Sequence, residues 1–231
     1  MKASVRNRVV IRLGIVLGVF MSLVANVAYG QAAGAGIAGT AHDPRSWNFG
    51  YPDGQVCVMC HAPHNTTTDG PLWNHQMSTA TYTLYASSTM NAVVGQPGQV
   101  SKLCMSCHDG TVGILNYGGA TGGMTLLDAY GQLGRSVLGN NMADDHPIGI
   151  TYNAALATSD GSLADPASKT VTIGSSTSKS GTIAAMMLVG GKIECTSCHD
   201  VHNKFTVGST TRNLLKVSVA GSALCLQCHT K

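Results

Sequence analysis

Charged and aromatic side chains are both scarce in this chain of 231 residues. Only 11% of the residues are charged and only 5% are aromatic, with three Phe and two Trp among them. A soluble domain usually carries about 25% charged residues, and a nucleic-acid-binding domain shows a clustered basic face. The composition therefore argues against a charge-rich disordered chain, an ordinary domain with an aromatic core and a protein whose partner is a nucleic acid.

Apolar runs long enough to span a membrane as a helix are absent after residue 30, and the N-terminal run has the pattern of a secretory signal. Four positively charged residues precede that run: Lys2, Arg6, Arg8 and Arg12. The uncharged segment 13–27 follows, and Ala28-Tyr29-Gly30 is a small-x-small cleavage site. We predict a signal peptide at residues 1–30, a mature chain that begins at Gln31, and membrane contact only during export. An uncleaved anchor is the alternative, because the uncharged stretch 13–30 reaches the lower limit of a membrane span.

No cysteine stands outside one repeated pattern, C-x-x-C-H. Its four copies are Cys57-Val-Met-Cys60-His61, Cys104-Met-Ser-Cys107-His108, Cys195-Thr-Ser-Cys198-His199 and Cys225-Leu-Gln-Cys228-His229. This is the attachment motif of c-type haem, in which two thiols add to the vinyl groups of one porphyrin and the histidine becomes the proximal iron ligand. We predict four covalent haem c groups, with thioethers at all eight cysteines.

The proximal iron ligands are then predicted to be His61, His108, His199 and His229. Structural zinc and disulfides are the alternatives. Zinc can use Cys-x-x-Cys pairs, but it does not require a histidine after every second cysteine. An exported chain could form disulfides, yet every cysteine belongs to the motif.

Five further histidines remain as candidates for the distal side of the irons: His42, His64, His75, His146 and His202. Four irons need four distal ligands to be six-coordinate. At least four of the five are therefore predicted distal ligands, and one is left spare or available to a neighbouring subunit. A haem that transforms a substrate needs an open or exchangeable iron position, so the histidine count favours electron transfer over an enzyme. Methionine is another axial ligand, but packing is its more ordinary role.

Two of the candidates have a constrained geometry. His64 and His202 each lie three residues after a proximal histidine, His61 and His199 respectively. Residues i and i+3 of a turn point to the same side, so neither can reach the opposite face of the haem bound beside it. Each is predicted to ligate a different haem, which would hold neighbouring haems close together. His146 precedes a proline and should project from an extended loop.

The spacing of the motifs predicts one tetrahaem domain over 31–231 rather than separate domains. Its loose halves, about 40–118 and 140–231, would hold two haems each. Each half begins its pair with C-x-x-C-H-x-x-H and ends it with a plain C-x-x-C-H, which indicates a loose internal repeat.

Regular secondary structure should be sparse between the motifs. The connecting segment 116–193 is rich in Gly, Ser and Thr, with a short helix expected near 124–133. The alternating sequence at 169–173 predicts one strand of a hairpin. The predicted fold class is mostly irregular coil, with short helices and few strands, organised around four covalently bound haems.

The chain resembles the exported multihaem cytochromes of metal-reducing bacteria. The resemblance is carried by His42-Asp43, CVMCHAPHN (57–65), PLWNH (71–75), SKLCMSCHDGTVG (101–113), DDHPIG (144–149), CTSCHDVHN (195–203) and LCLQCH (224–229). Motif number, order and size are most similar to the tetrahaem cytochromes that polymerise into extracellular filaments, the cytochrome nanowires. That resemblance implies bis-His irons in one continuous stack and a histidine that can ligate a haem in the neighbouring subunit.

The resemblance also implies partners and a location. The partners would be further copies of the chain, other multihaem cytochromes and extracellular electron acceptors, and the protein would work at the cell surface or beyond it. A periplasmic tetrahaem electron shuttle is the alternative. A multihaem reductase of nitrogen or sulfur oxyanions is a further alternative, and it would require one open iron position.

Overall fold

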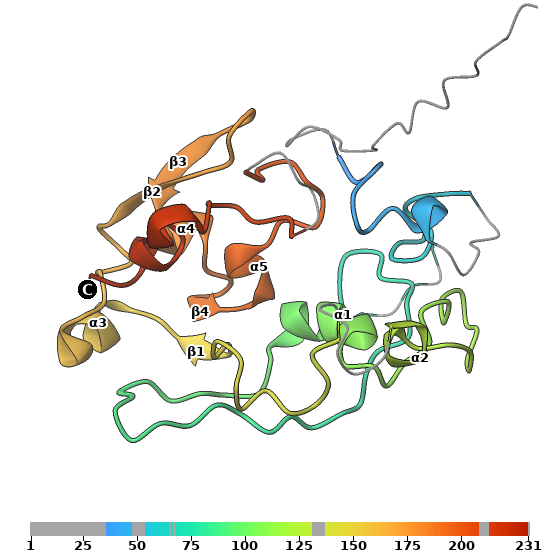
Figure 1. The fold of residues 1–231 in the computed structure, drawn as a ribbon, viewed down its shortest axis with the longest axis horizontal. Coiled ribbons are helices and arrows are strands. Elements are labelled where there is room, and N and C mark those ends of the chain that lie inside the picture. Colours follow the sequence, from blue (N-terminus) through green and yellow to red (C-terminus); the bar gives the residue numbers. More distant parts are fainter. Residues whose placement is uncertain are drawn as a thin grey trace, which may run out of the picture.

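The structure is a computed structural model that describes residues 36–47, 54–64, 66, 68–130, 137–207 and 213–230. Most of these residues lie in turns and irregular backbone between short elements (Figure 1). The coil-rich character of the predicted fold class is therefore confirmed. The predicted signal peptide at 1–30 lies outside the described residues.

The helices are short. They are η1 (Pro44–Ser46), α1 (Gln99–His108), α2 (Leu126–Tyr130), α3 (Ala154–Asp160), α4 (Ile183–Met186), α5 (Cys195–Cys198), η2 (Ala220–Ser222) and η3 (Cys225–Gln227). The bounds of α3 follow from its caps, because Asn153 accepts a hydrogen bond from Leu156 N and Gly161 adopts a left-handed conformation at the end. The helix expected near 124–133 is present as α2.

Two small antiparallel sheets are present in the described part of the chain. Strand β1 (Ile150–Thr151) pairs with β4 (Lys192–Ile193), and β2 (Thr170–Ile173) pairs with β3 (Lys179–Thr182). The strand predicted at 169–173 is confirmed as β2. Its alternation is confirmed, since Val171 and Ile173 are buried and Thr170 and Thr172 are exposed.

Three small apolar clusters take the place of one large core. The first surrounds Tyr152, Val171, Ile183 and Met187; the second contains Met59, Ile114 and Leu126; the third contains Tyr82, Met105 and Met142. Cysteines of the C-x-x-C-H motifs pack against two of these clusters, Cys60 and Cys107 against the second and Cys228 against the first. One cysteine each of the first, second and fourth motifs therefore packs against an apolar cluster.

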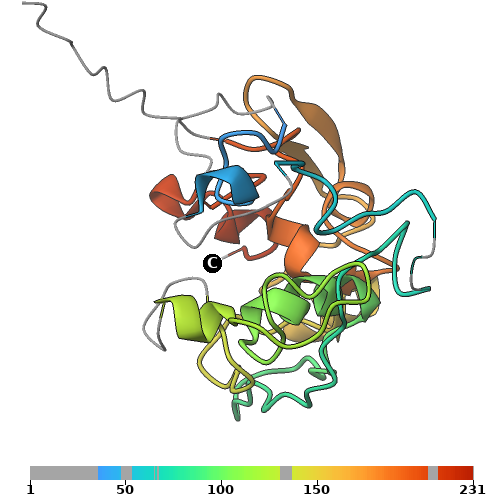
Figure 2. The same ribbon diagram turned by 90° about the vertical axis from the view of Figure 1, so that its right-hand side faces the viewer.

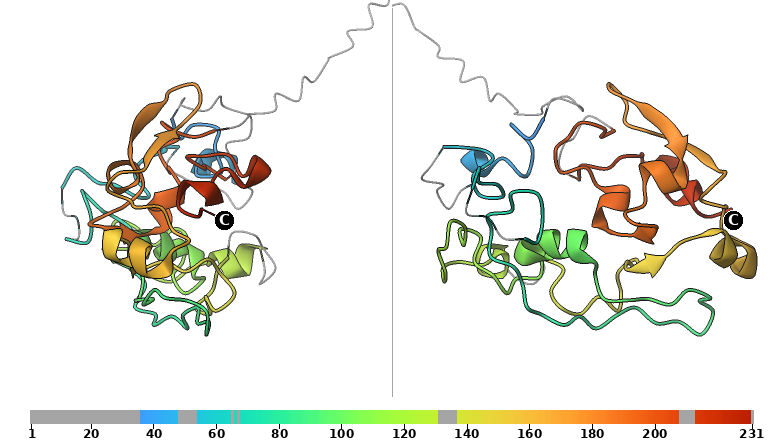
Figure 3. Two further views of the ribbon diagram at one scale, coloured as in Figure 1. Left: turned by 90° about the vertical axis from the view of Figure 1, so that its left-hand side faces the viewer. Right: turned by 180° about the vertical axis from the view of Figure 1, so that it is seen from behind.

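The described elements form two groups that meet at α1 and α5. The helices η1, α1 and α2 lie towards one end of the molecule, and the two sheets with α3 and α4 lie towards the other (Figures 1 and 3). Helix α5 packs beside α1 (Figure 2). The segment 76–98 leaves the first group and runs along the second, where Asn91 Nδ2 donates to Asp160 Oδ2 at 3.1 Å. None of the described helices is long and apolar enough to cross a bilayer.

Candidate haem sites

Each C-x-x-C-H motif forms a single tight turn. In the first, third and fourth motifs the histidine N–H donates to the carbonyl of the first cysteine, at 2.8, 3.1 and 2.9 Å respectively. The second motif forms the last residues of α1. One helical turn brings residues i, i+3 and i+4 to one side, so each motif presents two thiols and an imidazole together. All eight cysteines are described, and none of them forms a disulfide.

The proximal histidine of the first motif is held by the chain segment that follows it. His61 Nδ1 donates to Pro71 O at 3.0 Å, Ala62 N donates to Leu72 O at 3.0 Å, and Asn74 N donates to Cys60 O at 2.9 Å. A carbonyl on Nδ1 fixes the tautomer and orientation of an imidazole and leaves Nε2 for a metal. This arrangement agrees with the predicted role of His61 as an iron ligand.

The third motif repeats this arrangement. His199 Nδ1 donates to Asn213 O at 2.7 Å, Asp200 N donates to Leu214 O at 2.8 Å, and Lys216 N donates to Cys198 O at 2.8 Å. Leu214 has φ +50°, and Leu72 at the matching position of the first motif has φ +54°. The two C-x-x-C-H-x-x-H segments thus share a supporting turn.

Three proximal histidines each face a second histidine. Ring centroids are 6.1 Å apart for His61 and His202, 5.9 Å for His42 and His108, and 6.5 Å for His146 and His229. A metal–imidazole bond is about 2 Å long, so two imidazoles on opposite sides of one metal have centroids roughly 6 Å apart. All three separations fit a shared metal, and the residues present fit the haem that the motifs imply.

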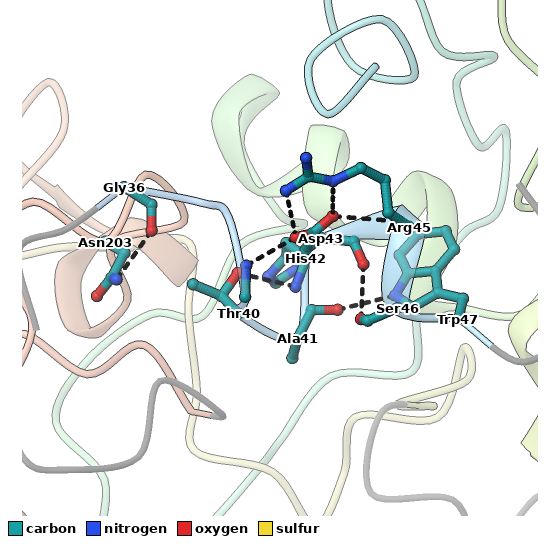
Figure 4. A network of polar contacts seen from close by, with 10 residues as sticks. Gly36, Thr40, Ala41, His42, Asp43, Arg45, Ser46, Trp47 and Asn203 are labelled. Carbon is teal, nitrogen blue, oxygen red and sulfur yellow. Dashed lines mark hydrogen bonds and ion pairs between the residues drawn. The ribbon is translucent and has the colours of Figure 1, made fainter. Parts of the chain in front are cut away.

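His42 reaches its partner from a turn that a carboxylate holds together. Asp43 accepts from Gly39 N at 2.7 Å and from Arg45 Nε and Nη2 at 2.8 and 2.7 Å (Figure 4). The Arg45 hydrogen bonds lower the pKa of Asp43 to about 2. Asn203 Nδ2 donates to Gly36 O at 2.9 Å, which ties this segment to the chain after the third motif (Figure 4).

The environment of His42 keeps its ring neutral. Burial lowers the pKa of His42 to about 4, with further contributions from His108 and His199. Its Nδ1 is buried and has no hydrogen-bond partner among the described residues. Neutral imidazole is the form that binds metals, so the ring is in the state that a ligand requires.

His75 differs from the other candidates. Its side chain is 1% exposed, Nδ1 lies 2.9 Å from Gln76 O, and Nε2 lies 3.1 Å from Ile114 O. Both ring nitrogens therefore face backbone carbonyls. Nε2 also lies 3.5 Å from Cys107 Sγ. His64 is exposed and, like His199, stands outside the three ring pairs.

Part of the chain matches a known protein family. The family described as a doubled CXXCH motif covers residues 187–231, which hold the third and fourth motifs. The motifs are those of a c-type cytochrome that binds haem c covalently and transfers electrons. A search of curated proteins found no match to the chain.

Sequence reasoning did not single out Asp109, which follows the second motif and is 4% exposed. Its carboxylate accepts from Ser78 Oγ, from Tyr82 Oη at 2.8 Å, and from the N–H and hydroxyl of Thr111, each at 2.8 Å. These bonds fix the chain directly after His108. An acidic residue after the motif is the only sequence signal, and it does not distinguish this buried carboxylate from the exposed ones.

Proposed function

We propose that this chain is a tetrahaem cytochrome that carries electrons along a closely spaced row of haems. The observation that carries the proposal is the pairing of three proximal histidines with a second histidine at the separation of one shared metal. Haem supplies reversible one-electron chemistry at its iron when it is bound. The chain contributes attachment and orientation of the imidazoles.

The ring pairs support a specific assignment of distal ligands. His202 serves the first motif, His42 the second and His146 the fourth. His64 serves the third motif, because it is the candidate left once His75 is held between two carbonyls. In this assignment the two C-x-x-C-H-x-x-H segments exchange their second histidines, which agrees with the expectation from the i, i+3 spacing that each ligates a haem other than the one beside it.

Full axial ligation supports electron transfer rather than reduction of a substrate. An enzyme would need one iron with an open position. With His75 set aside, the four remaining candidates complete four irons. We therefore assign the chain no catalytic residue.

We further propose that the protein is exported and forms a homopolymeric filament at the cell surface, which passes electrons to other multihaem cytochromes and extracellular acceptors. The outer motifs support this, since Cys57 of the first and Cys225 of the fourth are exposed. Apolar side chains accompany them, with Leu72 52% and Leu226 45% exposed. Because His42 faces His108 of its own chain, subunits would meet through these motif surfaces without exchanging His42.

Two measurements on the native protein, expressed with its haem-maturation machinery, test these proposals. Intact mass should report four haems, and electron paramagnetic resonance should report low-spin ferric iron only. A high-spin signal at native pH would favour the alternative that the protein is an oxyanion reductase. As a matched control, the double variant Cys104→Ala, Cys107→Ala should lose one haem.

Electron microscopy of material sheared from the cells tests the filament. Thin filaments with four haems per subunit in one unbroken chain are expected. Monodisperse single subunits confined to the periplasmic fraction would contradict the filament and favour the periplasmic shuttle.

A further inference from the structure

A buried carboxylate lies between the two helices that carry the second and third motifs. Glu194, at the start of α5, accepts hydrogen bonds from Ser101 Oγ and from Gly98 N, the latter at 3.2 Å. Ser101 Oγ in turn accepts from Cys195 N at 3.0 Å. Gly98, Ser101 and Glu194 are called the clasp below. It joins the first turn of α1 to the first residue of α5.

The clasp is buried in the molecule. Glu194 is 3% exposed and Ser101 is fully buried. A buried charge without partners is strongly destabilising, and hydrogen bonds to an ionised group are stronger than those to a neutral one. A carboxylate at the start of α1 is also stabilised by the positive end of the helix dipole. The two helices therefore have one strongly preferred separation, at which all three clasp residues are bonded.

Gly98 shows how closely the two helices approach. Its φ is −69°, a value that any residue adopts, so the backbone does not require glycine there. A Cβ atom at this position would overlap the carboxylate of Glu194. Glycine is required because Glu194 occupies that space.

The clasp connects the two helices that contain the second and third motifs. Helix α1 ends with Cys104–His108, and α5 begins with Cys195 directly after Glu194. We propose that Glu194 is a positioning residue that sets the separation and relative orientation of the second and third haems. This inference rests on the proposed function, because it concerns haems that those motifs would hold.

Circular dichroism in the Soret band provides the test, because two haems held close at a fixed angle give a band with a positive and a negative lobe. In Glu194→Ala this signal should weaken or change sign, while intact mass still reports four haems. Glu194→Gln, which retains an acceptor oxygen without the charge, should restore most of it. Asp128→Ala is the matched control, because Asp128 accepts a backbone N–H and a hydroxyl from Thr125 at 2.9 Å each, within a single segment. It should leave the band unchanged.

A double-mutant cycle separates positioning from a general loss of stability. Gly98→Ala should perturb the Soret signal in the presence of Glu194 and have little further effect in the Glu194→Ala background, because the overlapping group is then gone. Additive effects of the two substitutions would overturn the inference. So would an unchanged signal in Glu194→Ala. If Glu194→Ala loads haem incompletely, the Soret band of Gly98→Ala is compared with those of the wild type and of Asp128→Ala instead. An unchanged band in Gly98→Ala then overturns the inference.

Failure of the inference is distinguishable from failure of the proposed function. A wild-type protein without haem at the second and third motifs would remove the proposed function. Four haems in the wild type, with a Soret signal insensitive to the clasp, would remove only the role of Glu194.

Discussion

The imidazole ring of His202 lies nearly parallel to that of His61, with centroids 6.1 Å apart and planes inclined by 20°. The two residues belong to different motifs, since His202 follows the third motif and His61 ends the first. The chain that follows the third motif therefore lies against the first motif, and the two halves of the sequence cannot be separated without breaking this pair.

Replacing His202 by Ala should change the spin state of one haem. The iron at the first motif would lose its distal ligand, and a five-coordinate ferric haem is high-spin. We expect one of four haems to give a high-spin signal in electron paramagnetic resonance, with four haems still present by mass. Four low-spin signals in the variant would contradict the assignment of His202.

Replacing His75 by Phe should lower the stability of the protein without changing the spin state of any haem. The ring is buried between two carbonyls, and a neutral imidazole can donate to only one of them. Its loss leaves that carbonyl without a partner, which costs about 1–3 kcal/mol of unfolding free energy. Because His75 is assigned to no iron, all haems should stay low-spin. Denaturant unfolding monitors the first effect and electron paramagnetic resonance the second. Appearance of a high-spin haem would show that His75 is a ligand.

The leucines Leu72 and Leu214 share a left-handed backbone but differ in burial, with 52% and 3% of the side chain exposed. Leu72→Asn should raise the unfolding free energy by up to about 1 kcal/mol, since Asn tolerates this conformation better than Leu. Leu214→Ala should lower it by about 2–4 kcal/mol, because a buried side chain is removed. Equal effects in the two variants would contradict this account.

Asp109→Asn should destabilise the end of α1. The carboxylate accepts from three side chains and one backbone N–H, and an amide offers only one accepting oxygen to the same donors. We expect a loss of about 1–3 kcal/mol in unfolding free energy. Tyr82→Phe, which removes one of these bonds, is the graded control and should lose about 1 kcal/mol. A smaller loss in Asp109→Asn than in Tyr82→Phe would contradict the network.

The haem motifs, the coil-rich fold and strand β2 could be predicted from sequence because each depends on neighbouring residues. The C-x-x-C-H turn places its own three groups, and the alternation at 169–173 marks a half-buried strand. The partners of His42 and His146 could not be predicted, because they depend on how distant segments pack.

The sequence also could not predict that His75 differs from the other candidate ligands. Nothing in its sequence distinguishes it from the other candidates, and only the carbonyls of Gln76 and Ile114 set it apart. The shared turn of the first and third motifs was hidden as well. Its carbonyl acceptors, Pro71 and Asn213, follow their histidines at different distances along the chain, so no fixed period reveals them.

The overlap between a Cβ at residue 98 and the carboxylate of Glu194 also constrains how this protein can evolve. Residue 98 is not free to gain a side chain while Glu194 is present, because a larger residue at 98 requires a shorter one at 194. Related chains should therefore vary at the two positions together, with glycine accompanying glutamate. A lineage that lost the glutamate and then gained a side chain at 98 could not regain glutamate at 194 until glycine was restored at 98.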